Sequence, residues 1–292
     1  MENYVIVTDS CADLTIELVQ ETGVMVIPLT VTINNKTYYN YPDERELNLK
    51  EFYDMMRAGS MPSTSLINEH CFLEAFRPIL ASGKDLLYLG FDSTLSGTVG
   101  QAFSAANELR TEFPERKIVV VDTLSASMGF GLLVYYAANM KKEGSSIEEV
   151  AKWVEDNRLS FVHLFTVENL TTLKRGGRIS GATAILANLF DIKPVLYTDN
   201  EGRLVSLQKT RGRKKSLLTM VELSKERLTT DFAKDQVIFI GHADDEEMAH
   251  FLGDKFMETF HPQKIVYGHI GPVIGAHSGP GTIALFFRGT HR

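Results

Sequence analysis

The sequence has few of the features that mark several common classes of protein. Only two of its 292 residues are cysteines, Cys11 and Cys71, so at most one disulfide can form and a reducing cytoplasm is the expected compartment. No run of about 18 apolar residues occurs, which predicts that no segment spans a membrane. Residues 1–3 lack the basic stretch of a secretory signal peptide and lead directly into a predicted strand. The protein is therefore expected to work in solution.

An excess of positive charge is also missing, because the formal net charge is −7. This acidic balance argues against nucleic acid as the main partner. The chain contains no Gly-x-x-x-x-Gly-Lys-Ser/Thr loop, no Gly-x-Ser-x-Gly elbow and no His-Glu-x-x-His motif. These absences weaken the hypotheses of a kinase acting alone, a serine hydrolase and a zinc hydrolase.

What is present is the composition of an ordinary globular protein, with 44% hydrophobic and 23% charged residues. Short apolar runs alternate with helical patterns in the first half. Strands are predicted at 4–7, 24–33, 86–91 and 118–121, and helices at 48–57, 69–81, 98–112, 127–142 and 146–157. This alternation predicts parallel βαβ units in a doubly wound sheet.

The second half begins near residue 159 and has a different pattern. Candidate strands lie at 160–166, 193–199, 203–209, 236–241, 263–268 and 283–287. The turn Asp199-Asn200-Glu201-Gly202 predicts a hairpin, so this half is expected to hold a mixed sheet. The predicted fold class is α/β, with an N-terminal domain over 1–158 and a C-terminal domain over 159–292.

Three predicted strands of the first half end in aspartate, serine and threonine: Thr8-Asp9-Ser10, Asp92-Ser93-Thr94 and Asp122-Thr123. Because parallel strands end along one edge of a sheet, these side chains are expected to meet where α/β proteins bind ligands. The alternative is that each one caps the next helix. The stretch Ser96-Gly97-Thr98 favours a site, since two hydroxyls and a glycine open a helix. No lysine is nearby, so a carboxylate suits it better than a triphosphate.

Three further segments carry polar side chains. Residues 61–65 form a hydroxyl-rich stretch, read as a turn. Residues 173–180 form a basic, glycine-rich turn, and a helix end with cations near its negative pole would explain the lysine and one arginine but not Arg178. A basic cluster comprises Lys209, Arg211, Arg213, Lys214 and Lys215. It is either a solvated surface or a docking site for an anionic group.

The most unusual stretch is 269–281, with four glycines, two prolines and two histidines in thirteen residues. This composition predicts an irregular segment and no regular helix. Its histidines, His269 and His277, have no third ligand at zinc spacing, so no metal site is predicted. The acidic run 242–247 predicts the N-terminus of a helix.

Taken in chain order, these motifs resemble the DegV family over essentially the whole chain. The most specific are Leu95-Ser96-Gly97-Thr98 and 269–281, and Thr8-Asp9-Ser10, Thr64-Ser65, 174–179 and Lys193-Pro194 accompany them. Many members have Thr-Ser-Gln-Pro-Ser where this chain has Thr64-Ser65-Leu66-Ile67-Asn68, so the turn after Ser65 departs from the family pattern. The resemblance implies a protein that clamps one long-chain fatty acid, such as palmitate, between two α/β domains. It implies no cofactor and no catalytic residue.

By this resemblance, Thr64 and Ser96 hold the carboxylate. Further candidates for contact with the head group or a partner are Ser65, Gly97, Thr98, Arg178, Arg211, His269 and His277. The residues expected to line the slot for the apolar tail are Phe91, Phe103, Met128, Phe130, Ile185, Leu189 and Phe190. For each of them the alternative is that it simply belongs to the hydrophobic core.

The resemblance also implies a possible partner and a cellular role. Some members present the bound carboxylate to a separate ATP-binding fatty-acid kinase subunit, and the role is lipid transport or fatty acid metabolism. A free-standing phosphotransferase and a small-polyol-binding protein remain as alternative hypotheses.

Overall fold

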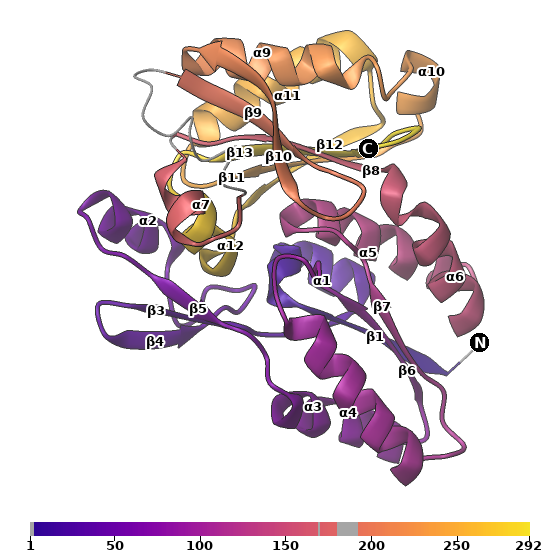
Figure 1. The fold of residues 1–292 in the computed structure, drawn as a ribbon. Coiled ribbons are helices and arrows are strands. Elements are labelled where there is room, and N and C mark those ends of the chain that lie inside the picture. Colours follow the sequence, from indigo (N-terminus) through magenta and orange to yellow (C-terminus); the bar gives the residue numbers. More distant parts are fainter. Residues whose placement is uncertain (1–2, 169, 180–191) are drawn as a thin grey trace.

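A parallel sheet organises the first half of the chain (Figure 1). The computed structural model describes residues 3–168, 170–179 and 192–292. Four parallel strands lie in the order β2 (Met25–Ile27), β1 (Tyr4–Asp9), β6 (Asp85–Gly90) and β7 (Ile118–Asp122). Helices α3 (Glu69–Ala81) and α4 (Thr98–Glu112) cover one face, while α1 (Ile16–Thr22), α5 (Ser127–Lys142) and α6 (Ile147–Asn157) lie on the other side. The predicted doubly wound parallel sheet is confirmed.

A six-stranded mixed sheet organises the second half. Its order is β10 (Leu204–Arg211), β9 (Ile192–Thr198), β8 (Phe161–Thr166), β13 (Ile283–Arg288), β11 (Val237–His242) and β12 (Lys264–His269). Only β11 and β12 pair in parallel, and β9 and β10 form the expected hairpin. Helices α9 (Arg213–Ser224), α10 (Thr230–Ala233) and α11 (Glu246–Phe260) lie on its outer side (Figure 1). The predicted mixed sheet is confirmed.

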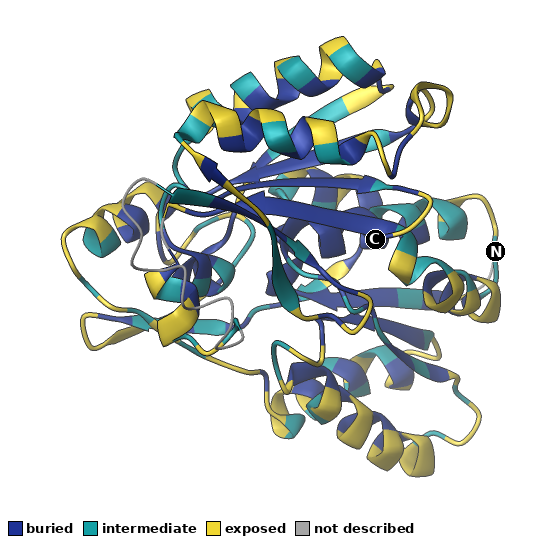
Figure 2. Cartoon of the chain, turned by 45° about the horizontal axis from the view of Figure 1, so that its top comes forward, coloured by how far each residue is buried: buried dark blue, intermediate teal, exposed yellow. Residues whose placement is uncertain are grey.

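Helix α5 lies between the two large sheets. It contacts β8, β11 and β13 on one side, and α1 and the short helix η1 (Ser10–Ala12) on the other. Ten of its residues are buried, including Met128 and Phe130. A helix surrounded by protein must be apolar on most sides, as its sequence predicts. Figure 2 shows the same layering, with buried strands at the centre and exposed residues on the outer helices.

A third, small antiparallel sheet was not predicted. It orders β4 (Lys36–Tyr39), β3 (Thr30–Ile33) and β5 (Ser63–Ser65), with α2 (Leu49–Arg57) nearby. The prediction of one strand over 24–33 is wrong, because Pro28 has no N–H to continue a ladder and the chain leaves β2 for another sheet. The prediction of a turn over 61–65 is also wrong for its last residues, since β5 pairs with β3.

The prediction that 269–281 contains no regular helix is wrong as well. Helix α12 spans Pro272–Ser278. Pro272 lies in its first turn, where the missing N–H costs nothing. Gly279 ends the helix with φ +86°, a conformation that favours glycine. Gly275 leaves room for the hydroxyl of Tyr53, which a Cβ at that position would meet. Glycine and proline thus start, end and pack this helix.

The predicted division into 1–158 and 159–292 stays a prediction. The two large sheets lie on either side of residue 158, but two helices pack across that division. Helix α5 packs on the second sheet, and α12 packs against α2, β3 and β5 of the first half. The halves therefore share an extensive interface, and this interface contains the cavity described next.

Candidate functional site

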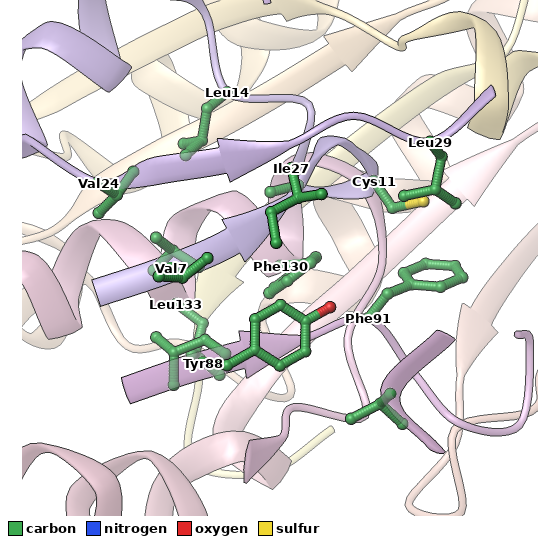
Figure 3. Close-up of a cluster of buried hydrophobic side chains, with 14 of the residues drawn as sticks. Val7, Cys11, Leu14, Val24, Ile27, Leu29, Tyr88, Phe91, Phe130 and Leu133 are labelled. Atoms are coloured by element: carbon green, nitrogen blue, oxygen red, sulfur yellow. The ribbon is translucent and has the colours of Figure 1, made fainter. Parts of the chain in front are cut away.

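A cavity of about 230 Å³ lies where the sheets meet. Its walls come from β5, β8, β9, β10, β13, α5, α12 and α7 (Thr171–Arg175), so both halves contribute. Apolar side chains dominate the lining: Leu29, Leu66, Phe91, Leu95, Phe165, Leu173, Leu204, Ile270, Val273, Ile274, Ala284 and Phe286. Figure 3 shows Cys11, Leu29 and Phe91 of this wall continuing into the core beside β1 and β6.

Of the residues predicted to contact an apolar tail, Phe91 lines the cavity. Phe103 lies on α4 with 40% of its surface exposed, and Met128 and Phe130 are fully buried core residues of α5 outside the cavity wall. The alternative hypothesis of plain core thus fits Met128 and Phe130, whereas Phe103 lies at the surface and fits neither hypothesis. Ile185, Leu189 and Phe190 lie outside the described residues.

One end of the cavity carries the predicted head-group residues. Thr64, Ser65, Ser96, Gly97, Arg178 and His277 all line the cavity. The Thr64 hydroxyl lies 2.8 Å from His277 Nε2, which joins β5 to α12. Ser96 Oγ lies 2.9 Å from Thr98 Oγ1 and accepts a hydrogen bond from the Thr98 N–H. Thr98 itself is buried behind Ser96 and positions it.

Arg178 brings a positive charge to this end. Its Nε donates to the carbonyl oxygen of Leu95 at 3.2 Å, and Nη1 donates to that of Gly176. These bonds tie the basic turn to the segment that holds Ser96. Among the cavity-lining residues that the structure describes, Arg178 is the only arginine or lysine. An anionic group in the cavity is therefore attracted to this end.

His277 is neutral at physiological pH. Burial lowers its pKa to about 4, and the positive charges of Arg178 and Arg175 add to the effect. Its Nδ1 is buried, has no hydrogen-bond partner and faces Gly176, where a Cβ would collide with the ring. The neutral imidazole can form a hydrogen bond with Thr64. Because it carries no charge, it does not compete with Arg178 for an anion.

The opposite end of the cavity has polar groups that are already satisfied. His163, which the sequence analysis did not single out, accepts from the Ala126 N–H and its Nδ1 lies 2.9 Å from the Phe161 carbonyl oxygen. Burial lowers the His163 pKa well below its usual value. The Ser127 hydroxyl donates to Asp13. Thr64, Ser96 and Arg178 thus bring two hydroxyl groups and a positive charge to the other end.

Two predicted contact residues lie elsewhere. Arg211 is exposed at the end of β10, and His269 lines a second cavity at the end of β12. In the basic cluster, Arg213 donates to Asp245 at 2.9 Å and to the Gly281 carbonyl oxygen. The structure does not bring these residues to the group around Thr64.

The polar strand ends mostly serve the fold. Asp9 accepts hydrogen bonds from the Tyr88 hydroxyl and from the N–H groups of Cys11 and Phe91. Asp122 accepts from two N–H groups of neighbouring loops. The capping alternative thus fits Asp9, which caps η1, whereas Asp122 bonds loop N–H groups and caps no helix in the described residues. Ser96, by contrast, lines the cavity.

Buried ionisable groups predict a free energy of unfolding that falls as pH rises above about 6.5. Burial raises the pKa of Asp13 to about 8 and that of Asp92 to about 7, so the stability that their protonated forms provide is lost as pH rises through these values. Burial lowers the pKa values of His163, His242 and His277, so their contribution is lost as pH falls below about 6.5. From pH 6.5 to pH 8.5 the free energy of unfolding is expected to fall by about 3 kcal/mol.

Urea denaturation across this range measures that decline. Asp92→Asn is expected to flatten it in part, because the amide does not titrate. A free energy of unfolding that stays constant or rises above pH 6.5 would contradict the prediction.

Neither a metal site nor a spanning helix was found in the described parts of the chain. No group of three or more His, Cys, Asp or Glu side chains is placed to hold a metal ion there. In the same ranges, no helix combines the length and the apolar character that crossing a bilayer requires. Cys11 is buried and Cys71 exposed, and both are free thiols.

Comparison with known proteins gives consistent results. The family model described as "Uncharacterised protein, DegV family" matches residues 3–290. A DegV domain-containing protein of Clostridium perfringens is 43% identical over 289 residues, covering 99% of this chain and 98% of that protein. One of Streptococcus pyogenes is 35% identical and covers 98% of each.

Solved structures agree with these sequence matches. A DegV family protein from Thermus thermophilus, described for its fatty acid binding, has a TM-score of 0.87 at 32% identity, covering 97% of this chain and 98% of that one. DegV from Bacillus subtilis, described as a fatty acid binding protein, has a TM-score of 0.84 at 27% identity, covering 98% and 99%. The extent of the family match and the identity to curated relatives show that this chain belongs to the DegV family.

Proposed function

We propose that the protein binds one long-chain fatty acid in the 230 Å³ cavity. The observation that carries the proposal is an apolar cavity with the hydroxyls of Thr64 and Ser96 and the charge of Arg178 at one end. The tail lies along the apolar wall, and the carboxylate lies between Thr64 and Ser96. The fatty acid binding described for the relatives from T. thermophilus and B. subtilis supports this assignment.

The two parts of the ligand have different tasks. A tail of about sixteen carbons gains roughly 0.8 kcal/mol per buried CH₂, or about 10 kcal/mol before the costs of association. The tail therefore supplies most of the affinity. The carboxylate needs orientation, which two hydroxyls provide, and the charge of Arg178 offsets the loss of its hydration.

Native mass spectrometry of the purified protein tests the proposal. The expected result is one bound fatty acid per chain, lost on delipidation and restored by palmitate. A delipidated protein that takes up no fatty acid would overturn the assignment. Saturable uptake of a small polyol instead would favour the polyol-binding hypothesis, which the apolar wall argues against.

The double variant Thr64→Ala with Ser96→Ala is expected to disturb the head group more than lipid retention. Removing both hydroxyls costs about 2–3 kcal/mol of carboxylate binding while the tail contacts remain. Native mass spectrometry should still detect bound palmitate. The ¹³C chemical shift of carboxyl-labelled palmitate should move towards its value in water. An unchanged shift would show that these hydroxyls do not hold the carboxylate.

We further propose that the bound carboxylate is presented to a separate ATP-binding kinase subunit, so that the chain binds lipid and the partner supplies the chemistry. Support comes from Arg178 at the head-group end and from exposed cations such as Arg211, which suit an anionic product or an acidic partner surface. Hydroxylamine trapping of acyl phosphate, with and without the kinase subunit, tests this. Acyl phosphate formed by this chain and MgATP alone would favour the free-standing phosphotransferase.

A further inference from the structure

A second cavity, of about 310 Å³, lies next to the first. Its wall includes Asp9 at the end of β1, Asp13 four residues later, His242 at the end of β11 and His269 at the end of β12. It thus lies at the carboxyl ends of parallel strands, where α/β proteins bind ligands. The segment 10–13 lies between the two cavities, because Cys11 lines the first while its neighbours line the second.

Asp13 is the unusual group of this cavity. The residue is only 8% exposed and has φ +46°. Its Oδ2 accepts a hydrogen bond from Ser127 at 2.6 Å. Its Oδ1 is buried without a hydrogen-bond partner, although the Gly271 N–H approaches the carboxyl group. A buried carboxyl oxygen without a donor is unfavourable unless a ligand supplies one.

The ionisable side chains in the wall of this cavity are carboxylic acids, histidines and tyrosines. The ionisable acids in its wall are Asp9, Asp13, Glu17, Glu44 and Glu246, and the described wall holds no lysine or arginine. Asp9 is satisfied by Tyr88, Cys11 and Phe91. The electrostatic potential therefore favours a cation and disfavours phosphates and carboxylates.

The histidines and tyrosines support the same conclusion. His242 Nδ1 accepts from the Asp245 N–H at 3.4 Å, and burial lowers its pKa to about 4, so the ring adds no positive charge. Tyr39 and Tyr267 present aromatic rings to the wall. Near the rim, Arg45 lies 4.4 Å from the ring centroid of Tyr41, a geometry in which an organic cation is attracted to an aromatic face.

We propose that the second cavity binds a small organic cation, a primary ammonium or guanidinium compound, whose charged head pairs with Asp13. A metal ion fits less well, because no group of three or more suitable ligands occurs in the part of the chain that the structure describes. This site is separate from the fatty acid cavity and does not depend on the proposed function.

Binding of the cation is coupled to release of a proton. Burial, with a smaller contribution from Asp9, raises the pKa of Asp13 to about 8, although hydrogen bonds from the Ser127 hydroxyl and the Gly271 N–H oppose the shift. The other groups that face Asp13 are Cys11 on its own segment, Tyr53 of α2, and His242 and His269 across the cavity. Asp13 is therefore protonated at neutral pH and must ionise to pair with a cation.

Calorimetry with n-propylammonium chloride tests the proposal, with n-propanol and glycerol as neutral probes. Affinity for the cation is expected to rise about 30-fold from pH 6.5 to pH 9, the ratio of ionised Asp13 at a pKa of about 8. At pH 7, titrations in phosphate and MOPS buffers, neither of which contains a primary ammonium group, should show release of close to one proton. Equal binding of a neutral probe, pH-independent affinity or no saturable binding of the cation would each overturn it.

Two variants complete the test. Asp13→Asn is expected to abolish cation binding at every pH, and asparagine tolerates a positive φ. If this variant does not fold, Glu246→Gln at the rim is expected to weaken binding a few-fold. Glu247→Gln is the matched control, because Glu247 is exposed and outside the cavity wall. Wild-type affinity in Asp13→Asn, or in Glu246→Gln where Asp13→Asn does not fold, overturns the proposal.

Native mass spectrometry of the same variants should show unchanged fatty acid content. This readout separates failure of the cation site from failure of the proposed fatty acid function.

Discussion

Leu204→Trp is expected to lower fatty acid affinity roughly a hundredfold. Leu204 opens β10, lines the cavity and pairs with Ile179, next to Arg178. An indole in this position occupies space that the acyl chain needs. Displacing three or four CH₂ groups from the wall costs about 3 kcal/mol. Titration of delipidated protein with a fluorescent fatty acid measures the change.

Val205→Trp is the matched control for this substitution. Val205 is the next residue on β10, so its side chain points to the opposite face of the strand, and it does not line the cavity. The affinity of the Val205→Trp variant for fatty acid is expected to stay within about twofold of the wild-type affinity, a difference in binding free energy below 1 kcal/mol. Equal losses in the two variants would show a general effect on folding and would argue against the cavity as the binding site.

Arg292→Ala is expected to destabilise the protein by about 3–5 kcal/mol. Arg292 is 6% exposed. Burial lowers its pKa to about 10, and the charges of Asp92 and Asp199 oppose that shift. Its guanidinium donates to acceptors from both halves of the chain: the carbonyl oxygens of Leu124, Arg158, Phe161 and Asp199, and the hydroxyl of Ser125.

Removal of this side chain leaves those buried acceptors without donors and loosens the contact between the halves. Thermal unfolding should show a Tm lower by roughly 10 °C. Arg77→Ala is the matched control, because the Arg77 side chain is 41% exposed and pairs with the exposed Glu108 and Glu112, and surface ion pairs contribute about 1 kcal/mol or less. A Tm for Arg292→Ala that is no lower than the Tm of the control variant would contradict this role.

The elements that the sequence predicted well are those with strong local signals. The helices 69–81, 98–112 and 127–142 have the predicted bounds, because apolar spacing and local stop signals determine them. The hydrophobic strands of both large sheets were also predicted from the sequence, because a buried strand must be apolar whatever strand it pairs with.

The errors concern segments whose structure depends on distant partners. Residues 63–65 are strand only because β3 lies beside them, and helix α12 forms where its glycines fit against Tyr53 and Thr172. Arg178, Ser96 and His277 come from three motifs that lie far apart in the sequence. Their common position at one end of a cavity follows from the packing of α12 and α7 against the first half.

The sequence by itself determined the α/β class, the parallel and mixed sheets and the family, because periodicity and motif residues are local properties of the chain. Only the tertiary structure decided which polar residues keep free hydrogen-bonding capacity. In the fold, Thr64, Ser96 and Arg178 line the same cavity. His163 forms hydrogen bonds within the protein, and His269 lines the second cavity with Asp13. The physical reason is that burial and hydrogen-bond partners come from residues far apart in the chain.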